Sequence, residues 1–106
     1  LIATLDTVHI PVIASGGLRN GLQAAKSLAL GASMVGIALP LLKPAMQSSD
    51  AVKKYLQNFI QELKVAMFAV GAKNLADLRK KPVLVTGKTA QWLELRNIDV
   101  EKFAKR

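Results

Sequence analysis

Two glycines followed by an arginine are the residues in this sequence best suited to bind an anion. The run Ser15-Gly16-Gly17-Leu18-Arg19 follows a short apolar stretch and precedes Asn20, a residue type that often caps helices. Glycine has no Cβ, so its backbone N–H can approach a phosphate closely, and a nearby helix N-terminus adds a favourable dipole. The same glycines are also consistent with a plain corner between a strand and a helix, because glycine is common in turns.

A second turn of small residues comes one structural unit later. Gly36-Ile37-Ala38-Leu39 closes another apolar run just before Pro40. Carboxyl ends of neighbouring parallel strands share one edge of a sheet, and ligands of α/β folds collect at that edge. The two turns together favour a phosphate site, whereas the spacing matches neither the G-x-G-x-x-G dinucleotide fingerprint nor a Walker A loop.

The elements around these turns alternate between strand and helix. The apolar run 10–14 predicts a strand buried on both faces, Asn20 and Gly31 delimit a helix, and 32–38 predicts a second strand. This order is typical of a βαβ unit with parallel strands. Two apolar strands do not complete a sheet, so the α/β class is predicted in a larger array, either a (β/α)8 barrel or a doubly wound sheet.

Residues 48–106 are predicted to be mainly helical. Oxygens at 48–50 can cap a long amphipathic helix that ends at Gly71, with an apolar face that packing explains best. That face comprises Val52, Tyr55, Leu56, Phe59, Ile60, Leu63, Met67 and Val70. The small helical tail is predicted as a helix from Asn74 to Leu78, an extended stretch over 82–87, a helix starting at Thr89, and a last turn capped by Asp99 and anchored by Phe103.

Composition restricts the classes of function. A chain of 106 residues can bury one core, and the absence of cysteine argues against a disulfide-stapled scaffold and fits a reducing, cytoplasmic setting. No apolar run reaches the ~20 residues that span a bilayer. The net charge is +8, but the cations are scattered, which favours a solvated surface over a nucleic-acid or membrane site. A basic module that binds acidic partners is the alternative.

Residues for acid–base or metal chemistry are not found together. The seven acidic residues fall at predicted caps or on exposed helical faces, so no catalytic pair and no metal site is predicted. His9 precedes the first strand, on the side away from the ligand edge, and is expected to be structural or exposed to solvent. Lys43 is expected to be a surface lysine.

The sequence resembles a known superfamily. The stretch PVIASGGLRNGLQAAKSLALGASMVGIALPLL resembles the last two βα units of FMN-dependent (β/α)8 barrels, among them 2-hydroxy-acid oxidases, IMP dehydrogenases and glutamate synthases. The segments 70–78, 82–87 and 92–99 are similar to the C-terminal region of type II isopentenyl-diphosphate isomerases. Many FMN barrels carry an arginine in a GIGRP-like sequence after the final strand. Here Gly36-Ile37-Ala38-Leu39-Pro40 lacks it, which argues against an oxidase or IMP dehydrogenase.

The resemblance implies that residues 1–106 are one region from the C-terminal part of a larger barrel. Residues 1–47 would form its last two βα units with the phosphate grip, and 48–106 a helical C-terminal part. The FMN phosphate would be held by Gly16, Gly17, Leu18, Arg19, Ala38 and Leu39. The implied activity interconverts isopentenyl and dimethylallyl diphosphate with reduced FMN, NADPH and Mg²⁺, in a cytoplasmic homo-oligomer. Its catalytic and metal-binding residues would precede Leu1. The alternative is an FMN-dependent oxidoreductase of the same superfamily.

Overall fold

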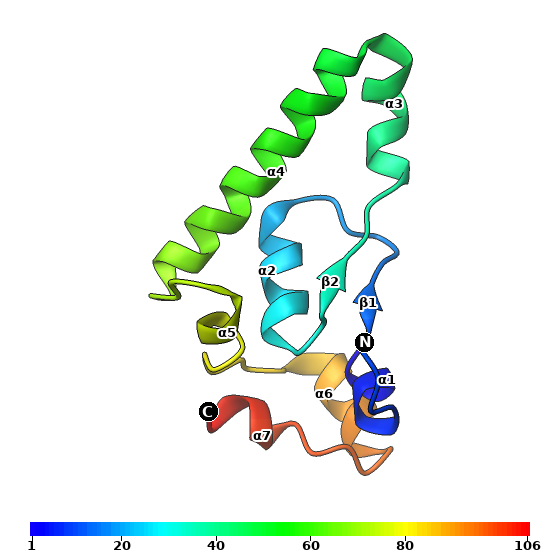
Figure 1. Ribbon diagram of the computed structural model, residues 1–106. Helices are drawn as coiled ribbons and strands as arrows, with labels where there is room; N and C mark the ends of the chain where they lie inside the picture. The colour runs from blue at the N-terminus through cyan, green and yellow to red at the C-terminus, as the bar shows by residue number, and fades with distance from the viewer.

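Seven helices and two short strands make up residues 1–106 in a computed structural model (Figure 1). In chain order they are α1 (Ile2–Thr7), β1 (Ile13–Ala14), α2 (Gly21–Ala29), β2 (Met34–Val35), α3 (Leu39–Gln47), α4 (Ser49–Ala69), α5 (Leu75–Leu78), α6 (Gly87–Glu94) and α7 (Glu101–Ala104). The predicted α/β class is confirmed for this chain: a small parallel sheet joined by a helix and followed by helical segments.

The two strands are parallel, with Ile13 opposite Met34 and Ala14 opposite Val35. The βαβ prediction is therefore confirmed, but the strands are shorter than expected. The prediction that they are buried on both faces is wrong for this chain. Val35 packs towards α2, whereas Ile13 and Met34 share the other face and are 60% and 61% exposed. The reason is that α2 covers only one side of the sheet.

Helix α2 begins and ends where the sequence predicted. The Asn20 side chain accepts a hydrogen bond from the Gln23 amide, and Gly31 follows the helix with a φ of 118°. Ala25, Leu28 and Ala29 are buried and form a core cluster with Ala72 and Leu78.

Helix α4 packs across α2 (Figure 1). Ser48 caps its start and Gly71 follows its end with a φ of 66°. The predicted packing of its apolar face is only partly realised: Phe59 is buried, whereas Leu56 and Ile60 are exposed. Helices α2 and α3 pack against α4, and Leu56 and Ile60 lie on the part of its surface that neither helix covers.

Helix α3 was not anticipated. The sequence predicts a strand over 32–38 that closes at Pro40, but the strand ends at Val35 and a helix begins at Leu39. Proline is tolerated in the first turn of a helix, where its missing N–H would have no partner. Helix α3 then packs against α4 to form a hairpin at one end of the molecule.

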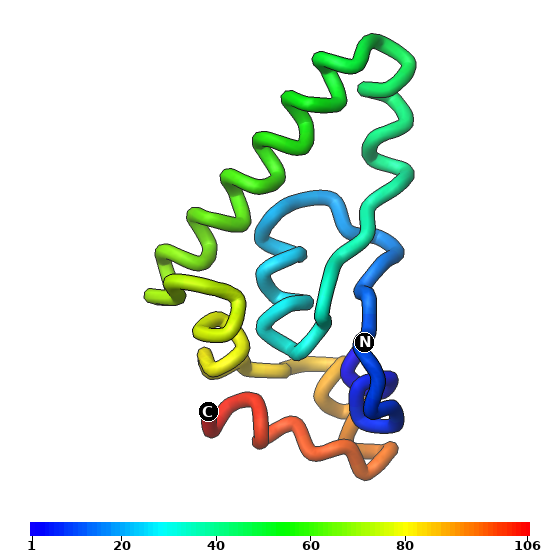
Figure 2. Tube along the Cα trace, in the orientation of Figure 1, coloured from blue at the N-terminus to red at the C-terminus, as the bar shows by residue number.

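Figure 2 shows the C-terminal segment beside the N-terminal segment at the other end of the molecule. A second core cluster joins these segments and consists of Ile2, Leu93, Ile98 and Phe103, so the predicted anchoring role of Phe103 is confirmed. Asp99 accepts a hydrogen bond from the Glu101 amide as expected, while α6 starts at Gly87 rather than Thr89. None of the helices combines the length and apolar character that crossing a membrane requires.

Candidate anion-binding site

A cavity of about 180 Å³ lies where the two strands end. Residues 15–19 after β1 form one wall, and residues 36–40, which lead into α3, form the other. The structure thus brings together all six predicted site residues around one cavity: Gly16, Gly17, Leu18, Arg19, Ala38 and Leu39. Their juxtaposition agrees with the sequence analysis, and their role in binding FMN stays a prediction.

The backbone amides of this cavity are available to a ligand. Those of Gly16, Gly17 and Leu18 donate no hydrogen bond within the chain, and neither do those of Ala38 and Leu39. Five N–H groups from two loops therefore remain free on the walls of one small cavity. Such a cluster of unpaired donors is suited to an anion with several oxygens, such as a phosphate.

The backbone conformation of the wall formed by residues 15–19 requires glycine at two positions. Gly16 and Gly17 have φ angles of 90° and 77°, which residues with side chains rarely adopt. A Cβ built on either residue would meet no atom within 4 Å, so close packing within the chain does not explain the two glycines. The open space in front of them leaves room for a ligand to approach the main chain.

The helix start that faces the cavity is that of α3. Its N-cap, Ala38, supplies no side-chain hydrogen bond, so the dipole at this end is uncompensated. The start of α2 is different, because Gly21 N–H donates to Glu62 Oε2 at 2.7 Å and Gln23 N–H donates to Asn20. The favourable helix end therefore comes from a helix that the sequence analysis did not identify.

Arg19 provides the cation at the edge of the cavity. Its N–H donates to Gln23 Oε1 and its carbonyl oxygen accepts from Tyr55 Oη, both at 2.7 Å. Its side chain is in no ion pair within the chain. The guanidinium group is therefore free to meet an anionic ligand, while its own backbone is fixed.

Tyr55 and Glu62 were missed as residues of this region. Tyr55 was grouped with the apolar face of α4, and Glu62 with the exposed acids. They are seven residues apart, which places both on the side of the helix that meets residues 19–21. The spacing was visible in the sequence, but the contact with the glycine loop depends on how α4 crosses α2.

Comparison of the sequence with known proteins bears on the family of this chain. A family model described as FMN-dependent dehydrogenase matches residues 1–85. The chain belongs to the FMN-dependent dehydrogenase family. The match includes the whole cavity, both strands and the helices up to α5.

Within this broad family, the chain is similar to proteins named isopentenyl-diphosphate delta-isomerase. The relative from Methanothermobacter thermautotrophicus is 47% identical over 99% of this chain, and the match spans 30% of the relative. The relative from Pyrococcus furiosus is 50% identical over 94% of this chain and 25% of its own length. The relative from Thermococcus kodakarensis is 48% identical over 92% of this chain and 26% of its own length. The predicted family resemblance is confirmed, and the chain spans only about a quarter to a third of these relatives.

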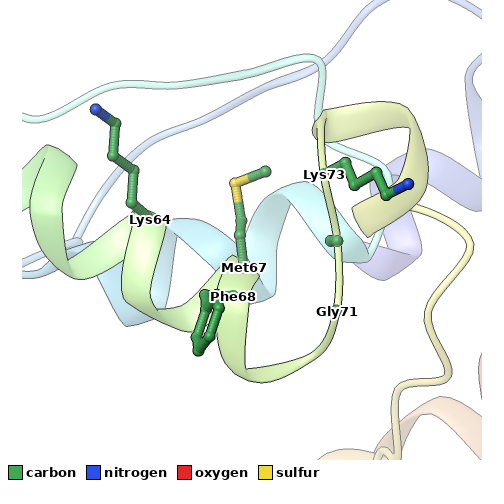
Figure 3. A pocket seen from close by; sticks show the side chains of 6 residues that line it. Lys64, Met67, Phe68, Gly71 and Lys73 are labelled. Atoms are coloured by element: carbon green, nitrogen blue, oxygen red, sulfur yellow. The ribbon is translucent and has the colours of Figure 1, made fainter.

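In this member of the FMN-dependent dehydrogenase family, a larger cavity lies away from the strand ends. It measures about 390 Å³ and lies beside the end of α4, with Met67 and Phe68 among its lining residues (Figure 3). Lys64 and Lys73 also line it, but Figure 3 shows that their side chains point in opposite directions. The polar groups do not converge there, in contrast to the free amides of the cavity between residues 15–19 and 36–40, called the glycine cavity below.

Other ionisable side chains lie outside the glycine cavity. His9 and Lys43 are exposed, as expected from the sequence. On α7, a hydrogen bond from Lys105 to the Glu101 carboxylate raises the pKa of that lysine. Arg19 is the ionisable side chain among the residues that line the glycine cavity, so it supplies the positive charge there for an anion.

Proposed function

We propose that this chain forms the FMN-phosphate-binding part of an isopentenyl-diphosphate isomerase of the type II family. The observation that carries the proposal is the 47% identity with an isomerase over 99% of the chain. The enzyme would interconvert isopentenyl and dimethylallyl diphosphate, a proton shift along an alkene without net oxidation.

The cavity fits the terminal phosphate of FMN. The free amides of Gly16, Gly17 and Leu18 would donate to phosphate oxygens from one side, and those of Ala38 and Leu39 from the other. Arg19 would neutralise charge, and the start of α3 would add its dipole. When reduced FMN is bound, its flavin supplies proton donation and acceptance to the alkene; residues 15–19 and 36–40 would fix where the flavin lies.

Other parts of the enzyme would come from outside residues 1–106. The exposed face with Ile13 and Met34 suits the interior of a (β/α)8 barrel, of which residues 1–47 would form the last two βα units. The substrate diphosphate, Mg²⁺ and NADPH would bind to the remainder of a cytoplasmic homo-oligomer. This chain would contribute no catalytic residue and no metal ligand of its own.

The full-length protein that contains this segment tests the proposal. With reduced FMN, Mg²⁺ and isopentenyl diphosphate it should form dimethylallyl diphosphate, and omission of FMN should abolish turnover. The family description as a dehydrogenase makes an oxidoreductase the second candidate. Oxidation of a hydroxy acid by an electron acceptor, without isomerisation, would refute the isomerase proposal and support that alternative.

A further inference from the structure

We infer that helix α4 positions the anion-binding loop from outside the cavity, with Tyr55 and Glu62 as its positioning residues. The inference rests on the proposed role of residues 15–19 in holding the FMN phosphate. Neither side chain lines the cavity, so neither would contact the phosphate.

Tyr55 and Gln23 fix the peptide groups on both sides of Arg19. Gln23 accepts from the Arg19 N–H, and the Tyr55 hydroxyl donates to the Arg19 carbonyl oxygen, each at 2.7 Å. Both main-chain polar groups of the residue that carries the positive charge are thereby satisfied. Rotation of either peptide plane would break one of these bonds, so the direction in which the guanidinium leaves the loop is restricted.

Glu62 fixes the point where the loop enters α2. Its carboxylate accepts a partly buried hydrogen bond from the Gly21 amide at 2.7 Å, and a charged acceptor strengthens such a bond. A Cβ at Gly21 would lie 2.3 Å from Leu63 N and from Phe59 O, so the start of α2 rests directly on the backbone of α4. The far end of the loop is therefore anchored on a 21-residue helix.

This anchoring matters because the loop has little internal support. Gly16 and Gly17 have free amides and open space around them, so local packing does not hold their positive φ angles. A preorganised loop binds more tightly because less conformational entropy is lost on binding. Loosening Arg19 or Gly21 should therefore weaken the affinity for a phosphate without removing any group that touches it.

The experiment compares FMN with riboflavin, which lacks the phosphate, on the full-length apoprotein. Tyr55→Phe removes the hydroxyl and keeps the ring, and Glu62→Ala removes the carboxylate. Each should weaken FMN binding about 3- to 10-fold, the size expected for one hydrogen bond, and leave riboflavin binding unchanged. Glu62→Gln retains an acceptor for the Gly21 amide and should restore most of the affinity. Gln57→Ala, an exposed position on the same helix, is the control.

Hydrogen exchange at the hydrogen-bonded amides of Arg19 and Gly21 provides a second readout that needs no ligand. It should accelerate in Tyr55→Phe and Glu62→Ala, and not in Gln57→Ala. FMN affinity and exchange equal to the wild type would overturn the inference, and so would a parallel loss of riboflavin affinity. If the wild type binds FMN no better than riboflavin, the proposed phosphate site itself fails. If the wild type binds FMN more tightly than riboflavin, and the variants show the same preference to the same extent, only the role of α4 is refuted.

Discussion

The amide of Gly36 donates a hydrogen bond of 2.8 Å to the carbonyl oxygen of Ala14. This bond joins the two strands one residue beyond β2, immediately before the two loops diverge around the cavity. The separation of the walls is thus set at this point, since both loops leave from a hydrogen-bonded pair of strands.

Gly36→Ala should disturb that point of divergence. The added Cβ would lie 3.2 Å from Ser15 Oγ and 3.4 Å from Ser15 Cβ, which is tight enough to displace the first loop. We expect about 1 kcal/mol of destabilisation and a weaker affinity for FMN. Chemical denaturation and flavin titration measure the two effects. The double variant with Ser15→Ala removes the nearer atom and should recover part of both losses; no recovery would contradict the steric explanation.

Gly17→Ala should reduce the affinity for FMN more than it reduces stability. At a φ of 77° an alanine is strained by about 1–2 kcal/mol, and its methyl group also enters the space in front of the loop. Gly87→Ala is a matched control, because Gly87 has a φ of 65°, equally open surroundings and no place in the cavity. Both variants should lose similar stability in denaturation. A similar loss of FMN affinity in both would argue against the site.

Arg19→Ala should weaken FMN binding roughly tenfold, because hydrogen bonds to charged groups contribute about 1.5–3 kcal/mol and this side chain is exposed. The difference in FMN affinity between the variant and the wild type should become smaller as the salt concentration is raised. Lys43→Ala removes the same charge on α3 outside the cavity and should have little effect. Equal effects of the two substitutions would mean that net charge, rather than a contact by Arg19, determines affinity.

Leu93→Ala should destabilise the tail by about 2–5 kcal/mol, since this leucine is 2% exposed within the second core cluster. Leu95 lies two residues away and is 85% exposed. Its replacement by alanine should change stability by less than about 0.5 kcal/mol. Urea denaturation of both variants makes the comparison. Comparable losses would show that the cluster does not stabilise the tail as its burial suggests.

Local signals made much of the fold predictable. Asn20, Ser48 and Asn74 each cap the helix that the sequence assigned to them, because capping depends on residues within one turn. The parallel pairing of β1 and β2 followed from two apolar runs separated by a single helix. The juxtaposition of Gly16 and Ala38 at one cavity followed from that pairing.

Features that depend on tertiary geometry were not predictable. Helix α3 was not predicted because two prolines, Pro40 and Pro44, argue against a helix in this segment, although Pro40 lies in the first turn, where proline is tolerated. The exposure of Leu56 depends on which part of α4 the neighbouring helices α2 and α3 cover, which periodicity does not specify. The bond between Gly21 and Glu62 links residues 41 apart in sequence, and no local pattern indicates it.

Helix α2 is held at its first residue by Glu62 and at its last by Arg106, whose guanidinium donates to the carbonyl oxygen of Ala29. Both contacts come from later in the polypeptide. During synthesis on the ribosome, the glycine turn emerges well before the side chains that brace this helix. The final position of α2 is therefore reached only after Arg106 has emerged, and flavin binding at the proposed site should follow that point of synthesis.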